Sequence, residues 1–229
     1  KEYEALGINS LIDGNYFQNV PLNITKTPKV NITINGEAFS YFDDFISLTA
    51  AASASFSAPE VVYAGYGIDD EKYSNYKDLN VEGKIVVVRG GEPKDKAGNH
   101  VITGDKTQSK WSNGRQALAA KRNAAKKNGA KALFFMDAQA FNAYSNFFRK
   151  REENGGSKSL SLPSKDDGEV EVYNFLISEK LGQALVGDLI KADKDGVWLG
   201  GFKAKTDVIT LGQGFVKIGD KVNVSYKQL

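Results

Sequence analysis

The chain has 229 residues, 41% of them hydrophobic, which is enough for a single domain with a buried core. Thirty basic residues face twenty-eight acidic ones, and the net charge of +2 excludes a strong overall attraction to nucleic acid or anionic lipid. The lack of cysteine excludes disulfides, thiolate nucleophiles and zinc sites built on sulfur. No apolar run approaches the roughly 20 residues that span a bilayer, so we expect no membrane span.

The first third of the sequence is patterned as β-strands. Residues 16–22 and 29–41 cluster β-branched and aromatic side chains. Within the second segment, Asn35 and Gly36 favour a type I′ turn, which predicts a hairpin. The small and polar stretch 50–55 is typical of a linker or of a closely packed extended segment, so we place a boundary near it.

Two buried strands and a helix are expected next. Residues 61–68 and 83–90 are apolar runs of strand length bounded by glycines, and the second is apolar enough to be buried on both faces. The period then changes to that of a helix, which Asn113 can cap and which Asn128 and Gly129 end. Alanine and leucine side chains share its predicted inner face. Its predicted outer face carries Arg115, Lys121, Arg122 and Lys126.

A further strand and helix follow. Residues 130–137 form an apolar run, so the order strand, helix, strand favours a parallel or mixed sheet with a right-handed crossover. Residues 139–151 have the spacing of a helix whose aromatic side chains lie on or near one face. These aromatic residues are Phe141, Tyr144, Phe147 and Phe148.

The last part of the chain alternates between loop, strand and helix. Residues 154–168 are rich in glycine, serine and lysine, as is typical of an exposed loop. Residues 170–177 are patterned as a strand, and Ser178 can cap a short helix that ends at Leu185. Residues 197–226 return to a β pattern. No repeat of fixed period is visible.

Several motifs in the middle of the chain point to one known family. Residues 63–68 are Tyr-Ala-Gly-Tyr-Gly-Ile, residues 73–79 have the spacing Tyr-x-x-Tyr-x-x-Leu, and residues 81–88 are Val-Glu-Gly-Lys-Ile-Val-Val-Val. A Lys-x-x-x-Ala-x-x-x-Gly-Ala pattern at residues 121–130 then precedes the strand that ends at Asp137. These motifs resemble the protease-associated (PA) domain inserted in co-catalytic-zinc aminopeptidases, the leucyl aminopeptidase-like metallopeptidases of bacteria.

The resemblance implies a β-rich α/β fold, either an open β-barrel or a mixed sheet, with two or three flanking helices. It divides the chain into N-terminal flanking strands (1–55), a PA core (56–190) and C-terminal strands that return toward an absent catalytic domain (191–229). All three parts can form one compact domain. By resemblance, the chain is a non-catalytic module that shapes substrate access or protein contacts. Its implied partners are the catalytic domain of the same polypeptide and a peptide or protein substrate.

The histidine count argues against a catalytic site in this sequence. The zinc pair of the resembled peptidases requires two histidines and several carboxylates, whereas His100 is the single histidine here. We therefore expect no catalytic, cofactor-binding or metal-binding residue in the chain, and zinc only in the absent catalytic domain. No carboxylate stands four residues from His100, so we interpret it as a loop residue, with a pH-sensitive or ligand-contacting role as the alternative. A serine triad would also lack its Gly-x-Ser-x-Gly elbow.

Clusters of charge suggest other functions, which we rank lower. The acidic groups at residues 43–44, 69–71 and 166–167 offer calcium ligands or a glycosidase carboxylate pair, but adjacent acids rarely act together, so we interpret them as structural or surface residues. The basic helix near Trp111 offers a nucleic-acid surface, but its charges lie on a predicted solvent face. We therefore expect no nucleic-acid partner.

The aromatic side chains are either core or a surface that a partner covers. We name a possible interaction surface of Trp111, Phe141, Tyr144 and Phe148. The alternative function is a free-standing peptide- or glycan-binding module that uses surface aromatics, Trp198 among them. The exposed loops expected to contact partners are residues 92–112 and 154–168.

The expected location of the parent protein is extracytoplasmic, meaning periplasmic, cell-surface or secreted. The resembled family works outside the cytoplasm, and Met136 is the first methionine of the sequence, so we expect a processed or trimmed chain. Three Asn-x-Ser/Thr sequons, at Asn23, Asn31 and Asn223, are compatible with secretion.

Overall fold

The structure is a computed structural model. It describes residues 5–10, 20, 22–25, 27–48, 54–58, 61–156, 159–162, 172–194, 213–214 and 222–227. Nearly all of the strand predicted at 16–22, most of the β region predicted at 197–226, and Trp198 lie outside the described residues.

Six strands form the main sheet, in the order β11-β6-β7-β8-β10-β4. Four of them are parallel neighbours: β6 (Val61–Tyr63), β7 (Ile85–Arg89), β8 (Ala132–Met136) and β10 (Tyr173–Ile177). Two edge strands are antiparallel to their neighbours: β4 (Phe45–Ser47) and β11 (Gln213–Gly214). The sheet is therefore mixed, which confirms one of the two arrangements that the strand, helix, strand order favoured.

A second sheet contains four antiparallel strands, in the order β3-β2-β12-β5. Their bounds are Glu37–Phe39 for β3, Lys29–Ile34 for β2, Val222–Lys227 for β12 and Ala54–Ala58 for β5. The predicted hairpin is confirmed, because β2 pairs with β3 across Asn35 (φ 53°) and Gly36 (φ 86°). A type I′ turn requires positive φ at both central positions, which asparagine and glycine tolerate best.

A short third ladder pairs β1 (Asn23–Thr25) with β9 (Ser159–Ser161). The strand β9 falls inside residues 154–168, so the prediction of a continuous loop there is wrong for these residues. Its partner strand is remote in the sequence, and local composition carries no information on that pairing. For the stretch 50–55, predicted as a linker or a closely packed extended segment, the described residues Ala54 and Ser55 begin β5, which agrees with the extended alternative.

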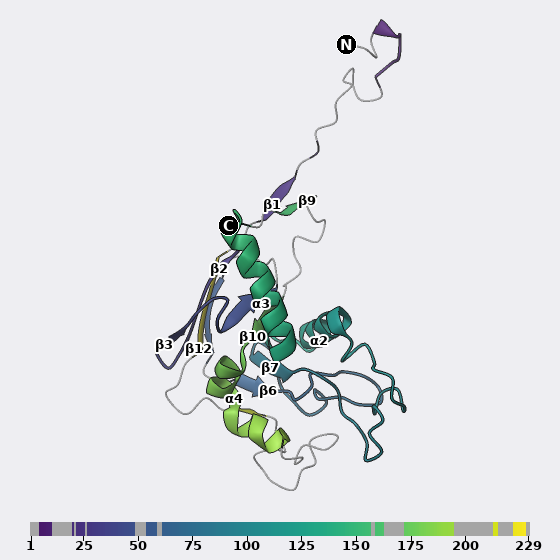
Figure 1. The fold of residues 1–229 in the computed structure, drawn as a ribbon, viewed down its shortest axis with the longest axis vertical. Helices are drawn as coiled ribbons and strands as arrows, with labels where there is room; N and C mark the ends of the chain where they lie inside the picture. Colours follow the sequence, from purple (N-terminus) through teal and green to yellow (C-terminus); the bar gives the residue numbers. More distant parts are fainter. Residues whose placement is uncertain are drawn as a thin grey trace.

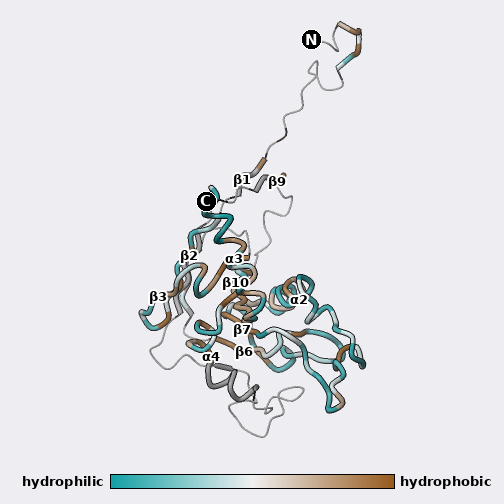
Figure 2. The backbone as a smooth tube through the Cα atoms, in the orientation of Figure 1, coloured by the Kyte–Doolittle hydropathy of each residue, from teal (hydrophilic) through white to brown (hydrophobic). Residues whose placement is uncertain are grey.

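The main sheet is covered on both faces, and alternate residues of β7 belong to different layers. Val86 and Val88 belong to a core cluster that also contains Phe141 of a helix, whereas Val87 belongs to a second cluster with Ile32 of the antiparallel sheet. Figure 1 shows β2, β3 and β12 grouped apart from α2. Figure 2 shows hydrophobic residues gathered around β6, β7 and β10, while the loops beside α2 are largely hydrophilic. The helices α2 and α3 therefore cover one face of the mixed sheet, and the antiparallel sheet and α4 cover the other.

Two helices connect the parallel strands. The helix α2 (Gly114–Lys127) joins β7 to β8 and stands where the sequence predicted a helix. Asn113 occupies the N-cap position, but its side chain makes no capping hydrogen bond with any described residue. The helix α3 (Ala138–Glu153) follows β8 and begins at Asp137, whose carboxylate accepts a 2.9 Å hydrogen bond from the Ala140 amide. Carboxylates at this position also interact favourably with the helix dipole.

The last helix, α4, spans Glu179–Lys194. Ser178 caps it as predicted, because its hydroxyl oxygen accepts a 3.2 Å hydrogen bond from the Leu181 amide. The predicted end at Leu185 agrees with a break in the helical backbone at the next residue, Val186 (φ −143°, ψ 30°), beyond which a second helical segment continues to Lys194. None of the described helices is long and apolar enough to cross a membrane.

The fold class is confirmed as β-rich α/β. The described residues form a mixed sheet with helices α2, α3 and α4, and within them no sheet closes into a barrel. Of the two architectures that the PA resemblance implied, the mixed sheet is therefore the one present.

Candidate functional site

A pocket of about 440 Å³ lies where the parallel strands β7 and β8 end. In open α/β sheets, ligands bind in the crevice outside the carboxyl ends of the strands. Both walls come from helices, since the first turns of α2 and α3 supply lining residues. The lining includes Gly91, Arg115, Leu118, Phe135, Asp137 and Tyr144. We call this the edge pocket.

Asp137 supplies the carboxylate of the edge pocket. Its Oδ1 atom accepts the hydrogen bond from Ala140 that starts α3, and among the described residues its Oδ2 atom has no hydrogen-bond partner. A Cβ atom at Gly90 would lie 2.2 Å from that Oδ2 atom. The glycine after β7 therefore leaves the space that this carboxylate oxygen occupies.

Arg115 supplies the opposite charge from the first turn of α2. Its side chain is exposed, while the floor of the pocket is apolar because Phe135 is buried and Leu118 is half-buried. Guanidinium groups bind carboxylates through two parallel hydrogen bonds. The edge pocket thus combines a carboxylate, a guanidinium and an apolar surface.

Lys121 lies in the interior, next to the edge pocket. Its side chain is fully buried, and its ammonium donates hydrogen bonds to the carbonyl oxygens of Tyr66 and Gly91, the latter at 3.0 Å. Burial lowers the pKa of Lys121 to about 7; Glu92 and Asp137 oppose this shift and Arg89 adds to it. The prediction that this lysine points into solvent is wrong, because its ammonium lies against the backbone of the turns after β6 and β7.

Glu92 holds the loop between β7 and α2. Its buried carboxylate accepts hydrogen bonds from the Ser109 amide at 2.8 Å and the Ser109 hydroxyl at 2.6 Å, and also from the Ser112 hydroxyl. Burial opposes ionisation of Glu92, but these hydrogen bonds outweigh it and lower its pKa. Hydrogen bonds to this buried carboxylate therefore join the two ends of the predicted contact loop 92–112.

His100 lies on this loop, as predicted, but it is only 5% exposed. Its Nδ1 atom is 3.1 Å from Oε1 of Glu92. Glu92 stands eight residues before His100, and only the fold of the loop brings the two together, so the absence of a carboxylate four residues from His100 gave no signal of this contact. The alternative role of His100, pH-sensitive or ligand-contacting, stays a prediction.

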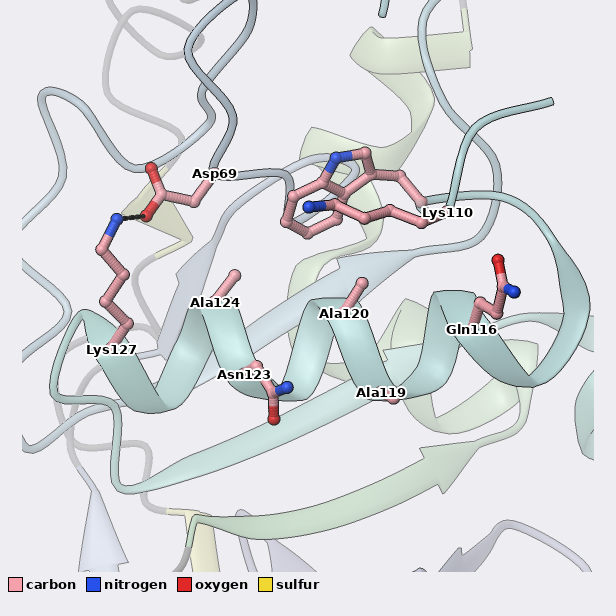
Figure 3. Close-up of a pocket in the computed structure, with 9 residues that line it drawn as sticks. Asp69, Lys110, Gln116, Ala119, Ala120, Asn123, Ala124 and Lys127 are labelled. Carbon is pink, nitrogen blue, oxygen red and sulfur yellow. Dashed lines mark hydrogen bonds and ion pairs between the residues drawn. The ribbon is translucent and has the colours of Figure 1, made fainter. Parts of the chain in front are cut away.

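The other side of α2 carries a larger hollow of about 580 Å³, which Figure 3 shows. The α2 surface facing it has small side chains, including Ala120 and Ala124. Its rim contains an ion pair in which the Lys127 ammonium lies 2.8 Å from Oδ2 of Asp69. Burial opposes ionisation of Asp69, but hydrogen bonds from Lys127, Asn128 and Ser74 lower its pKa. The charges of Lys127 and Asp69 are thus paired with each other, while the Lys110 ammonium lies 5.1 Å from the Trp111 ring centroid.

The four residues of the predicted interaction surface lie in different environments. Trp111 and Phe141 are 3% and 6% exposed, so these two rings are core and offer little area to a partner. The Trp111 indole nitrogen also lies 3.4 Å from Oδ2 of Asp70. Tyr144 and Phe148 are half-buried and stack with ring centroids 6.3 Å apart. The predicted surface is therefore not one continuous patch, and only Tyr144 belongs to the edge pocket.

The acidic groups singled out in the sequence lie apart. Asp43 pairs with Arg149 at 2.7 Å, whereas buried Asp44 accepts a hydrogen bond from the Ser40 amide. Residues 166–167 lie outside the described residues. Within the part of the chain that the structure describes, no three histidine or acidic side chains are placed to hold a metal ion.

Comparison with known proteins adds no relative. No family model matches the sequence, and no curated protein matches it significantly.

Proposed function

We propose that this chain is a non-catalytic accessory module of a zinc aminopeptidase and that it binds peptide substrate or product beside the active site. The proposal combines the PA resemblance with the edge pocket, whose charged and apolar lining suits peptide ends. It places the zinc and the turnover in a catalytic domain of the same polypeptide. It also places the parent protein outside the cytoplasm, which depends on the resemblance alone.

The contacts of the Glu92 carboxylate are the observation that best supports a non-catalytic role. In a serine triad, the serine hydroxyl donates a hydrogen bond to one ring nitrogen of the histidine, and the other ring nitrogen donates one to the carboxylate. Here the Ser109 hydroxyl donates to Glu92 itself, and His100 approaches the same carboxylate. This geometry stabilises a loop and activates no hydroxyl.

The test compares this chain with the longer polypeptide encoded by the same open reading frame. Zinc content and hydrolysis of aminoacyl substrates are measured on both. We expect both properties only in the longer polypeptide. Zinc binding or turnover by this chain alone would overturn the non-catalytic role.

The edge pocket also favours the second candidate, a free-standing peptide-binding module. If the longer polypeptide contains no zinc and cleaves no aminoacyl substrate, the peptidase assignment fails and this second candidate replaces it. A glycan ligand is disfavoured because the pocket offers opposite charges, which suit peptide ends better than neutral hydroxyl groups.

A further inference from the structure

We propose that the edge pocket binds a short peptide of two or three residues by both of its free ends, with the peptide ammonium on Asp137 and the peptide carboxylate on Arg115. The inference rests on the proposed function for its biological setting, but the binding itself is a property of this chain. It assigns a ligand class to a pocket that the PA resemblance does not describe.

The ammonium assignment follows from the free Oδ2 atom of Asp137. Oδ1 is used to start α3, while Oδ2, which has no hydrogen-bond partner among the described residues, occupies the space that a side chain at position 90 would take. An anion there would be repelled, whereas a primary ammonium would gain a charge-assisted hydrogen bond. The nearby positive charge of Lys121 already donates to two backbone carbonyl oxygens and is fully buried. It is therefore not available as the ligand's partner.

The carboxylate assignment follows from Arg115 and its position in the first turn of α2. Its guanidinium can bind a carboxylate through two hydrogen bonds, and the positive end of the helix dipole adds to the attraction. The side chain of Asn113 makes no capping hydrogen bond with any described residue. The first backbone amides of α2 therefore meet no competition from this side chain when a ligand carboxylate approaches them.

The size and the floor of the pocket define the rest of the ligand. A volume of about 440 Å³ is within the range of roughly 300–1,000 Å³ typical of small-ligand sites, so both charged ends of the ligand must lie within one small cavity. The floor offers Phe135 and Leu118 to an apolar side chain. We therefore expect a short peptide with an aliphatic residue, which belongs to the class of product that a peptidase releases.

The binding test uses isothermal titration calorimetry on the 229-residue chain with the dipeptide Leu-Gly, its N-acetyl form and its C-terminal amide. We expect Leu-Gly to bind and each blocked form to bind at least about tenfold more weakly, a difference of about 1.4 kcal/mol. Equal affinity for the free and acetylated peptides, or no binding of Leu-Gly at millimolar concentration, would overturn the proposal. Binding that needs only the carboxylate would overturn it as well, since the site would then be a simple anion site.

The variants Asp137→Asn and Arg115→Gln test the two contacts separately. Asparagine is also a good N-cap residue, so Asp137→Asn should keep α3 while losing the charge for the ammonium. We expect it to weaken Leu-Gly binding at least about tenfold and to leave binding of the acetylated peptide unchanged. Arg115→Gln should weaken Leu-Gly and spare the amide. Asp43→Asn and Arg122→Gln are matched controls outside the pocket lining, and a loss of binding in them equal to that in the pocket variants would contradict the assignment.

The outcomes separate this proposal from the proposed function. Charge-dependent dipeptide binding with an inert longer polypeptide would support the pocket and overturn the peptidase assignment. If the longer polypeptide is an active zinc peptidase but this chain does not bind Leu-Gly, the ligand proposed for the edge pocket is wrong. The accessory role would then remain.

Discussion

The Nζ atom of Lys121 donates a 3.0 Å hydrogen bond to the carbonyl oxygen of Gly91, so a charged side chain from the middle of α2 holds the turn that follows β7. The same ammonium donates to the Tyr66 carbonyl oxygen in the turn after β6. One lysine thus joins the ends of two parallel strands to the helix that covers them. The edge pocket lies beside this junction, because Gly91 and Phe135 line the pocket and the Phe135 ring centroid is 5.8 Å from the lysine Nζ.

The lowered pKa of Lys121 predicts that stability rises with pH across the alkaline range. Its pKa is about 7 in the folded state and about 10.5 in the unfolded chain, so between these values the unfolded state binds more protons. The free energy of unfolding should therefore increase from pH 7 to pH 10, as measured by urea denaturation. In Lys121→Met this increase should disappear.

At pH 10 the Lys121→Met variant should also be less stable than the wild type by about 1–3 kcal/mol, because two carbonyl oxygens lose their donor. The control is Lys77→Met, which removes an exposed lysine and should keep the wild-type pH dependence. An unchanged pH slope in Lys121→Met would mean that this lysine titrates at its ordinary pKa.

The carboxylate of Glu92 predicts the opposite pH dependence on the acidic side. Because its folded pKa is lowered, its stabilising effect is present above the usual value of 4.5 and is lost as the pH falls through the folded pKa. At pH 7, Glu92→Gln should lower the free energy of unfolding by about 1–3 kcal/mol, since three hydrogen bonds lose an ionised acceptor. The deficit should shrink on acidification.

Urea denaturation from pH 7 down to pH 3 measures this, with exposed Glu82→Gln as the control for the loss of one carboxylate. Amide hydrogen exchange should also become faster across residues 92–112 in Glu92→Gln. A deficit that stays constant over this pH range would exclude the ionised form as the source of the effect.

The interior of this fold was largely predictable from sequence, because its strands and helices have strong local patterns. The buried parallel strand β7 is an apolar run between glycines, β8 is an apolar run after Gly129, and α2 and α3 have helical periods with recognisable ends. The strand β9 was not predictable, because it depends on a partner more than a hundred residues earlier. Local composition around Ser159–Ser161 is that of a loop.

The candidate site was only partly predictable. Asp137 follows a buried strand and precedes a helix, which is the local signal of the carboxyl edge of a sheet, yet its proximity to Arg115 depends on how α2 packs beside α3. The burial of Lys121 could not be predicted either, because it depends on contacts between segments that are far apart in the sequence. A lysine on the polar face of an isolated helix is normally solvated, and only the turns that end at Tyr66 and Gly91 cover this one.

The aromatic residues of α3 predict a sharp contrast between two phenylalanines. Phe141 is 6% exposed in the core, so Phe141→Ala should lower the free energy of unfolding by about 3–5 kcal/mol. Phe147 is 56% exposed and contacts the edge of Phe148, so Phe147→Ala should change it by less than about 0.5 kcal/mol. Thermal denaturation of this chain measures both. If Phe147 contacts a catalytic domain, its variant should destabilise only the longer polypeptide.

Two glycines with left-handed backbones predict the cost of close packing at β7. Gly67 has a φ of +62°, and a Cβ atom there would lie 2.6 Å from Cγ1 and 2.9 Å from Cβ of Val88. Gly83 has a φ of +69°, but among the described residues no atom lies within 4 Å of a Cβ placed on it. Gly83→Ala should therefore cost about 1–2 kcal/mol from backbone conformation alone. Gly67→Ala should cost about 1–3 kcal/mol more, because Val88 is buried and β-branched and cannot move aside.

Thermal denaturation separates the two contributions, since 1 kcal/mol corresponds to a shift of about 2–4 °C in Tm for a chain of this size. The double variant Gly67→Ala, Val88→Ala identifies the steric part, because removing the valine methyl groups opens the space that the new Cβ atom needs. The added cost of Gly67→Ala should then fall when it is measured against Val88→Ala alone. If Gly67→Ala and Gly83→Ala are equally destabilising, contact with Val88 is not what requires glycine at position 67.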